Sequence, residues 1–353
     1  MKTLEILGRE PSAIPISTVW LLNDLAEYRG KQELFTKQVP QRLKKLREHA
    51  LIESAVASNR IEGVTVDPKR EATVVLGRAA LRDRNEQEVR GYQSALAWIH
   101  AENGAIAWTP KTILKFHAMT RPDTWDGGKF KREDGEIIEK HPDGRVTVRF
   151  RPVPARETPA AIQNLCRLSK DLLREKTVPP LIVWAAQNLD FLCIHPFRDG
   201  NGRVSRLLLL LTLYHLGFTG GRYVSLERII EQSKDRYYET LRQSSQGWHK
   251  GRHDFWPFVN YLLYGLKELY VEFEQRVGAL GAARGEKTEA VRQAISSCAL
   301  PFHVGEIQRR CPGVSLDMIR KVLKDLRKNG EVECTSRGKN ATWRALGNRP
   351  DNR

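Results

Sequence analysis

The chain has 353 residues, of which 41% are hydrophobic and 28% are charged, a composition typical of a globular protein with a sizeable core. It contains no run of 18 or more apolar residues, so we expect no membrane-spanning helix and no membrane partner. The formal net charge of +16 favours polyanionic partners such as nucleic acid or nucleotide, and the alternative is a generally basic surface. The five cysteines form no CxxC pair, which predicts free thiols and a cytoplasmic location.

Residues from about 16 to 280 are predicted to be mostly helical. Apolar residues recur at spacings of three and four in the segments 20–28, 48–61, 88–100 and 111–119. Thr109-Pro110 indicates the start of the last of these helices, with threonine as N-cap and proline at the first helical position.

Two features interrupt this helical pattern. Ser58-Asn59-Arg60-Ile61-Glu62-Gly63 is typical of a helix end with Gly63 as the stop, and Glu62 alone would then be a solvated charge. Between residues 127 and 154, short β-type runs containing Ile137-Ile138 and Val146 to Phe150 flank a turn at 141–144, which predicts a β-hairpin. Such a hairpin serves either as a flap over a site or as a plain surface loop.

Helices are predicted to resume at 158–176 and 180–193, and the segment that follows concentrates chemically useful groups. Gly200-Asn201-Gly202 predicts a tight turn before a helix that starts at about Arg203, and a helix N-terminus is a ready anion site. Arg203 and Arg206 lie three residues apart, on one helix face suited to a polyphosphate. Asp199 precedes the turn, where its carboxylate could hold Mg²⁺ against phosphates, and His195 could act as a general base. Phe197 is interpreted as a core anchor.

Each of these residues also has an ordinary interpretation. A histidine before proline is more often structural, a Gly-Asn-Gly triplet is usually only a turn, and arginines on a helix face are usually solvated. Asp199 could simply pair with one of the arginines. What favours the catalytic interpretation is the presence of all these groups within the twelve residues from His195 to Arg206.

The segment from His195 to Arg206 resembles the signature of the Fic family, HxFx(D/E)GNGRxxR, with every fixed position present. The resemblance extends to Gly128-Lys129-Phe130-Lys131, which looks like the start of the family's flap, and to the paired tyrosines Tyr237-Tyr238. It covers roughly residues 15 to 270. It implies a mainly α, helical Fic fold with a β-hairpin flap.

The resemblance also implies an activity, the transfer of AMP from ATP to a protein hydroxyl with release of pyrophosphate. His195 would deprotonate a Ser, Thr or Tyr hydroxyl of a target protein, or of the protein itself, and Asp199 would hold Mg²⁺. The flap around Ile137 and Ile138 would dock the target segment as an added strand. The implied ATP contacts are Gly200, Asn201, Gly202, Arg203, Val204, Ser205, Arg206, Gln232 and Tyr238.

Three positions bear on the base and the reaction. Asn188 stands where many relatives carry a histidine, and Ser245 stands where some have an asparagine near adenine, which leaves base selectivity open. Gly202 favours AMP transfer, because a branch of the family typified by the Doc toxin has lysine there and acts as a kinase.

Ser58 and Glu62 fit the inhibitory motif (S/T)xxxE(G/N) of many Fic proteins. In that pattern the glutamate pairs with the second arginine of the signature, here Arg206, and takes the space that the γ-phosphate of ATP needs. A charge-assisted bond then competes with the substrate for one guanidinium.

The remainder of the chain predicts a separate small domain. The expected division is an N-terminal helical region at 1–110 with the inhibitory helix at about 48–63, a catalytic core at 111–277, a linker at 278–285 and a winged helix-turn-helix domain at 286–353. The last assignment is based on two helices, a third with a basic face that begins after Ser315, and a hairpin with a basic tip at 337–340. DNA binding by 286–353 is the functional interpretation, and a wing for protein interaction or homodimer formation is the alternative.

These observations leave three functions to compare. The first is a self-inhibited protein adenylyltransferase. The second is a DNA-binding regulator whose Fic domain only senses nucleotide, against which the intact His195 argues, because a sensor needs no base. The third is removal of AMP from modified proteins by the same site, with Glu62 positioning water.

Overall fold

The computed structural model describes residues 2–9, 13–38, 40–140, 144–281, 286–296, 298, 301–311, 314–336 and 341–346. The chain divides into two compact units, Met1–Glu274 and Gln275–Arg353. The predicted boundary at residue 110 therefore lies inside one compact unit.

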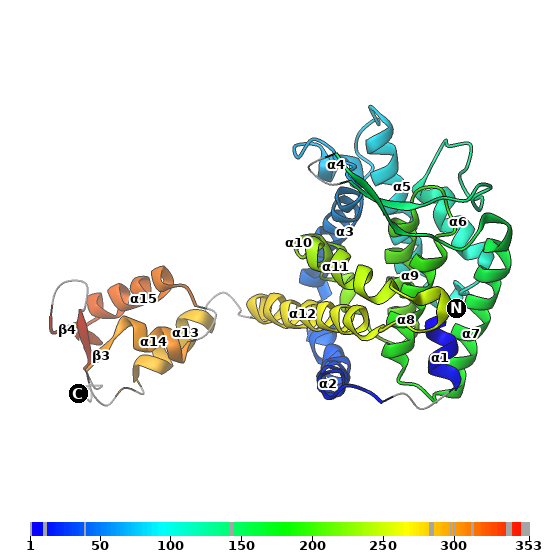
Figure 1. Cartoon of the computed structure of the whole chain (residues 1–353). Helices are drawn as coiled ribbons and strands as arrows, with labels where there is room; N and C mark the ends of the chain where they lie inside the picture. Colours follow the sequence, from blue (N-terminus) through cyan, green and yellow to red (C-terminus); the bar gives the residue numbers. More distant parts are fainter. Residues whose placement is uncertain are drawn as a thin grey trace. The chain divides into compact units, whose positions relative to one another are not determined.

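Two helices form the centre of the first unit (Figure 1). Every residue of α8 (Pro180–Ile194) from Leu181 onward is buried, and α9 (Asn201–His215) is buried except for Gly202 and its last residue. α8 is apolar on nearly all sides, as expected for a helix enclosed by others. The two helices pack together and are joined by residues 195–200, so the signature segment lies at their junction.

The surrounding helices cover this pair. α1 (Lys2–Arg9) and α7 (Thr158–Glu175) pack on α8, whereas α5 (Arg84–Glu102) and α6 (Pro110–Thr120) pack on α9. A second layer follows, because α3 (Pro40–Ile61) packs on α5 and also contacts α9.

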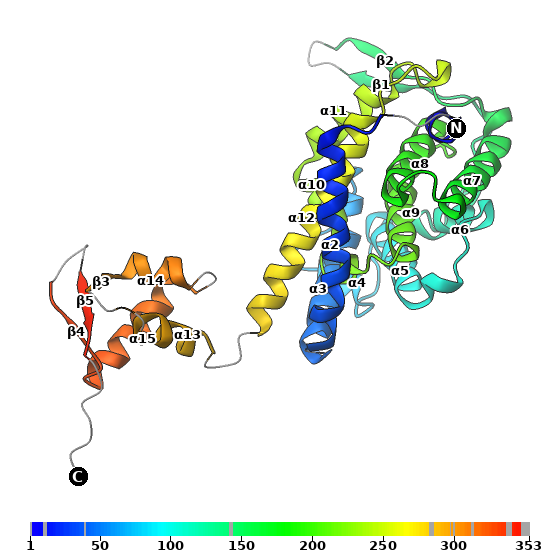
Figure 2. The same cartoon turned by 90° about the horizontal axis from the view of Figure 1, so that it is seen from below.

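The other helices complete the first unit, and α12 (Trp256–Gly281) continues past the last residue of this unit, Glu274. α4 (Glu71–Val75) and α10 (Leu226–Gln232) pack against α3, and α11 (Lys234–Ser245) contacts α8. α2 (Ile16–Gln38) runs beside α12 in both views, with Tyr28 stacked on Tyr270 (Figure 2).

The predicted hairpin is confirmed. β1 (Ile137–Lys140) pairs antiparallel with β2 (Val146–Phe150), and a bulge lies between Ile137 and Ile138. Its predicted turn falls on residues 141–143, which lie outside the described part of the chain.

Local sequence signals mark the helix starts to within two residues, and α12 extends into the segment expected to be a linker. Thr109 accepts a hydrogen bond from the Thr112 N–H, with Pro110 in the first turn, as predicted. α9 begins at Asn201 rather than at Arg203. Residues 278–281 of the expected linker at 278–285 are the last residues of α12, and residues 282–285 lie outside the described part of the chain.

The second unit has its own core. Its helices are α13 (Glu286–Ser296), α14 (Val304–Arg310) and α15 (Leu316–Lys328), and its sheet has the order β3-β5-β4. The strands are β3 (Phe302–His303), β4 (Val332–Cys334) and β5 (Thr342–Ala345). Ser315 caps α15 by accepting from the Met318 N–H, as predicted. The expected basic tip at 337–340 lies outside the described residues, and the winged helix-turn-helix assignment stays a prediction.

Two further findings concern the whole described part of the chain. All five cysteines are free thiols. None of the helices in the described segments is both long and apolar enough to cross a membrane.

Candidate active site

His195 ends α8 in an unusual backbone conformation. Its φ is +49°, in the left-handed region that non-glycine residues rarely adopt, and its N–H bonds the Phe191 carbonyl at 3.0 Å. Strained residues of this kind are concentrated at functional sites, because the surrounding structure must hold them. Here the helix end turns the imidazole into a pocket.

Burial is the main cause that lowers the pKa of His195, to about 4, and the nearby charge of Lys131 acts in the same direction. The Leu192 carbonyl, Glu62 and Asp199 oppose that shift. The imidazole is therefore neutral at pH 7, with a free nitrogen lone pair, as a general base requires. Burial also lowers the pKa of Lys131, to about 8, and its ammonium donates to the Ile194 carbonyl at 3.2 Å.

Asn201 braces the loop that connects His195 to α9. Its side-chain oxygen accepts from the Phe197 N–H at 2.9 Å, and its side-chain nitrogen donates to the Phe197 carbonyl at 2.8 Å. Phe197 is 1% exposed, as expected for a core anchor. Because both polar atoms of the Asn201 amide are used inside the loop, its own contact with a phosphate would come from the backbone N–H.

His117 on α6 holds the loop from the other side. Its ring stacks on Phe197 with centroids 3.8 Å apart. Nδ1 accepts from the Gly128 N–H at 3.0 Å, so the neutral ring carries its proton on Nε2, which donates to the Asp199 carbonyl at 3.0 Å. Burial lowers the pKa of His117 to about 4 and keeps this tautomer neutral. One ring thus joins the start of the flap to the signature loop.

The start of α9 has the geometry of an anion site. Gly200 precedes the helix with φ +83°, which glycine adopts without strain. The N–H groups in the first turn of a helix have no intrahelical acceptor, and they carry the positive end of the helix dipole. Val204 and Ser205, also expected to contact ATP, have buried side chains, and the Ser205 hydroxyl donates to the Gly202 carbonyl at 2.8 Å.

Arg206 and the end of α3 form a buried cluster. The Arg206 guanidinium is 1% exposed and donates to Glu62 Oε1 at 2.8 Å. It also donates from Nε to the Ser58 hydroxyl and from Nη2 to the Ser58 carbonyl, both at 2.8 Å. Its Nη1 is buried without a hydrogen-bond partner among the described residues. Ser58 and Glu62 thus both contact the second arginine of the signature.

Gly202 leaves room for the Glu62 carboxylate. A Cβ built on Gly202 would lie 2.1 Å from Glu62 Oε1 and 3.1 Å from Arg206 Nη1. Any larger residue would compete with Glu62 for this space. The glycine and the Glu62–Arg206 contact therefore depend on each other.

Arg203 takes part in a second buried charge network. Its guanidinium is 1% exposed, donates to the Glu88 carboxylate on α5, and lies 3.6 Å from Asp199 Oδ1. Arg121, at the end of α6, contacts Glu88 Oε1 and Asp199 Oδ2, each at 2.8 Å. Arg203 and Arg206 therefore have different acidic partners.

Asp199 is suited to bind a metal ion together with a phosphate of the substrate. Its side chain is 52% exposed and presents hard carboxylate oxygens at the mouth of the anion site. No group of three or more His, Cys, Asp or Glu side chains in the described segments could hold a metal ion by itself. Mg²⁺ is usually bound by one or two carboxylates together with substrate phosphates, which agrees with a single carboxylate here.

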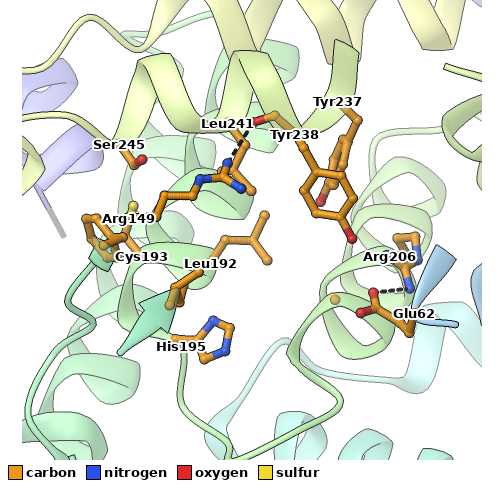
Figure 3. A pocket seen from close by; sticks show the side chains of 13 residues that line it. Glu62, Arg149, Leu192, Cys193, His195, Arg206, Tyr237, Tyr238, Leu241 and Ser245 are labelled. Carbon is orange, nitrogen blue, oxygen red and sulfur yellow. Dashed lines mark hydrogen bonds and ion pairs between the residues drawn. The ribbon is translucent and has the colours of Figure 1, made fainter. Parts of the chain in front are cut away.

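A pocket of about 130 Å³ is lined by His195, Gly202, Glu62 and Arg206. Figure 3 shows His195 facing into it from one side and the Glu62–Arg206 pair from another, with Tyr238 on α11 next to that pair. Burial raises the pKa of Tyr238 to about 12. Gln232, the other expected nucleoside contact, does not line this pocket and accepts from Arg228 at 2.9 Å.

The flap closes one wall of the pocket. Ile137 lines it, whereas Ile138 is 46% exposed. Arg149 on β2 also lines the pocket and donates to the Tyr238 carbonyl at 2.7 Å, which ties the flap to α11. On the far side of Ile137 and His195 lies a second hollow, lined by residues 129–137 together with Trp125 and Arg198.

Comparison of the sequence with known protein families identifies one family. A sequence model described as "Fic/DOC family" matches residues 107–213, which include α6, the flap, α8 and most of α9. Residues 107–213 of this chain therefore form a Fic/DOC family domain. "Protein adenylyltransferase Fic" from Aedes aegypti is 26% identical over 232 residues, and the protein of that name from Drosophila melanogaster is 25% identical over 229 residues. Each match covers 62% of this chain but only 41% of the insect protein.

Solved structures show the same fold. A Fic family protein from Desulfovibrio desulfuricans G20 matches with a TM-score of 0.61 at 21% identity, covering 97% of this chain and 100% of that one. Fic-1 from C. elegans, residues 134–508, matches with a TM-score of 0.57 at 20% identity, covering 74% of this chain and 72% of that one. At this identity the comparison establishes the helical Fic fold alone.

Several residues of the site were not found from the sequence. His117, Glu88 and Arg121 lie on helices far from the signature in sequence, and nothing in their local pattern distinguishes them from ordinary helix residues. Arg149 lies in the predicted hairpin, yet only the folded chain shows that it reaches α11. Lys131 lies in the segment that resembles the start of the flap, but the sequence does not indicate that it contacts the site.

We predict that His117→Phe keeps the ring stack but leaves the Gly128 N–H and the Asp199 carbonyl without their partner. Each unsatisfied buried group costs about 1–3 kcal/mol. Urea denaturation is expected to show a loss of about 2–6 kcal/mol for the two groups together, and calorimetry is expected to show weaker ATP binding. His100→Phe is the matched control, because that histidine bonds the Tyr214 hydroxyl at 3.2 Å away from the pocket lining. Equal ATP affinity in both variants would show that His117 does not shape the site.

The lowered pKa of His195 can be measured directly. The ring is expected to stay neutral as pH falls through 6.5 and to gain its proton only near pH 4, because burial disfavours the charged form. An NMR titration of the histidine ring signals, with His195→Gln identifying the resonance, tests this. A midpoint near 6.5 would contradict the buried, neutral base.

Proposed function

We propose that this protein transfers AMP from ATP to a hydroxyl group of a target protein, or of itself, and releases pyrophosphate. The observation that carries the proposal is that the neutral His195 imidazole, Gly202 at the N-terminus of α9 and Arg206 line one pocket. The names of the insect relatives support the same reaction class. Because the chain covers less than half of those proteins, the activity is a proposal for this chain.

The reaction follows from the roles of these groups. His195 takes the proton of the attacking hydroxyl, whose oxygen forms a bond to the α-phosphorus while the bond to the bridging oxygen of the β-phosphate breaks. The first-turn N–H groups of α9 and the guanidiniums of Arg203 and Arg206 stabilise the phosphate charge. Asp199 would hold Mg²⁺, which neutralises phosphate charge when bound.

Two further assignments belong to this proposal. Tyr238 is placed beside the nucleoside, since it lines the pocket on the α11 side. The flap receives the target segment along β1, where Ile138 is exposed and Ile137 lies beside His195. An extended segment added there would bring its hydroxyl toward the imidazole.

The Glu62–Arg206 contact is proposed as the inhibitory state. The Arg206 guanidinium is almost fully buried, so its charge needs a partner, and Glu62 supplies one in the absence of nucleotide. A γ-phosphate would have to displace that carboxylate. ATP therefore binds in a non-productive position while Glu62 stays in place.

We predict that Glu62→Gly increases transfer by about one to two orders of magnitude. A charge-assisted hydrogen bond contributes about 1.5–3 kcal/mol, and about 1.4 kcal/mol corresponds to a factor of ten. The measurement is self-labelling with ATP labelled at the α-phosphate. Glu62→Gly combined with His195→Ala should lose labelling, because the base is missing although the inhibitory contact is gone.

Two outcomes would contradict this assignment. Equal labelling of the wild type and Glu62→Gly would exclude Glu62 as the inhibitory group. Strong labelling of Glu62→Gly combined with Arg206→Ala would show that Arg206 is not the residue that Glu62 restrains, because that variant lacks the γ-phosphate partner.

A second function is proposed for the second unit, namely binding of duplex DNA. α15 buries Ile319, Val322, Leu323 and Leu326 in its core. Its exposed side presents five cations, Arg320, Lys321, Lys324, Arg327 and Lys328. A helix with one basic exposed face after a two-helix arrangement favours docking to the phosphate backbone.

We predict that the full chain binds duplex DNA with an affinity that falls steeply with salt, because phosphate contacts release counterions. Neutralising Lys321, Lys324 and Lys328 together should weaken binding and reduce the salt dependence, measured by fluorescence anisotropy. Neutralising Lys44, Lys45 and Lys69 in the first unit changes the net charge equally and serves as the control. Equal effects of the two triple variants would exclude α15 as the DNA-binding helix.

A further inference from the structure

The carboxylate of Asp199 is already occupied by protein cations. Arg121 Nη1 lies 2.8 Å from Asp199 Oδ2, and Arg203 Nη2 lies 3.6 Å from Asp199 Oδ1. The Gly200 N–H also donates to this carboxylate, at 2.5 Å from Oδ1. Both oxygens that would bind a metal therefore face positive groups.

Arg121 is held where it is by a second acid. The same Nη1 that contacts Asp199 also contacts Glu88 Oε1 at 2.8 Å, and the Arg121 side chain is 9% exposed. Glu88 is 4% exposed and cannot move to solvent without opening the helix packing. Because Glu88 stays as a partner, Arg121 can release Asp199 without becoming a buried, unpaired charge.

The charges around Asp199 are balanced without a metal. Two carboxylates, Asp199 and Glu88, face two buried guanidiniums, Arg121 and Arg203, and the exposed Arg84 also contacts Glu88. This group therefore has no net negative charge to attract a divalent cation. A guanidinium at 2.8 Å also competes for the same carboxylate oxygen as a metal ion would. A triphosphate changes this balance, because it adds several negative charges beside α9.

We propose that Arg121 is a positioning residue that keeps the metal off Asp199 until nucleotide phosphates arrive. The inference rests on the proposed role of Asp199 as metal ligand. In the free protein Arg121 holds the carboxylate. In the nucleotide complex the phosphates draw the divalent cation, Asp199 turns to it, and Arg121 remains on Glu88. Metal and nucleotide then bind in a mutually dependent way, so the metal does not occupy a site that lacks nucleotide.

The test uses Mn²⁺ as the probe, because free and bound Mn²⁺ are distinguished by electron paramagnetic resonance without any activity measurement. The full-length chain is titrated with Mn²⁺ in the absence and presence of ATP. We expect the wild type to bind Mn²⁺ at Asp199 only with ATP. Arg121→Gln is expected to bind Mn²⁺ without nucleotide at least tenfold more tightly than the wild type, and adding Asp199→Asn should remove that gain.

Arg84 supplies a matched control. Its side chain is 59% exposed and contacts the same Glu88 oxygen at 2.9 Å, but it has no contact with Asp199. Arg84→Gln should therefore behave as the wild type, and Arg121→Lys, which keeps the charge, should lie near the wild type. If Arg121→Gln fails to fold, the wild type with and without ATP still tests the dependence on nucleotide.

Three outcomes overturn the proposal. The first is equal Mn²⁺ affinity of Arg121→Gln and the wild type without ATP. The second is tight Mn²⁺ binding by the nucleotide-free wild type that Asp199→Asn abolishes. The third is an unchanged affinity for Mn²⁺ in the presence of ATP when Asp199→Asn is compared with the wild type. That result would also exclude Asp199 as a metal ligand. α-Phosphate labelling by Glu62→Gly separates this last case from failure of the transferase proposal.

Discussion

The site depends on the short connection between two buried helices. α8 and α9 pack closely together over most of their length, so residues 195–200 must turn the chain within a narrow space. The turn needs left-handed backbone conformations at His195 and Gly200, and the Asn201 amide closes it on the Phe197 backbone. Because the turn is rigid, the imidazole and the N-terminus of α9 keep a fixed relation.

The two buried arginines of the signature, Arg203 and Arg206, take their acidic partners from helices outside the signature. Arg203 and Arg206 are almost fully enclosed, and buried cations require paired anions. Glu88 on α5 and Glu62 at the end of α3 supply them. Each buried guanidinium needs an anionic partner, so the residues that enclose Arg203 and Arg206 must include these carboxylates.

The same reasoning connects the flap with the rest of the pocket. His117 bonds the backbone where the flap starts, and Arg149 bonds the α11 backbone from the flap's second strand. The hairpin is therefore held near its beginning by His117 and near its end by Arg149, which also lines the pocket. A target segment lying on β1 would be placed relative to His195 by these two contacts.

The sequence by itself determined the features that depend on neighbouring residues: the caps at Thr109 and Ser315, the hairpin, and the signature from His195 to Arg206. These features are readable because a cap or a tight turn is made by groups a few residues apart. The approach of Glu62 to Arg206 could be stated only through resemblance to a family, since these residues are 144 positions apart. The partners Glu88, Arg121 and His117 were decided by tertiary packing. A buried charge takes whichever partner the packed helices bring within reach, and no local periodicity records that choice.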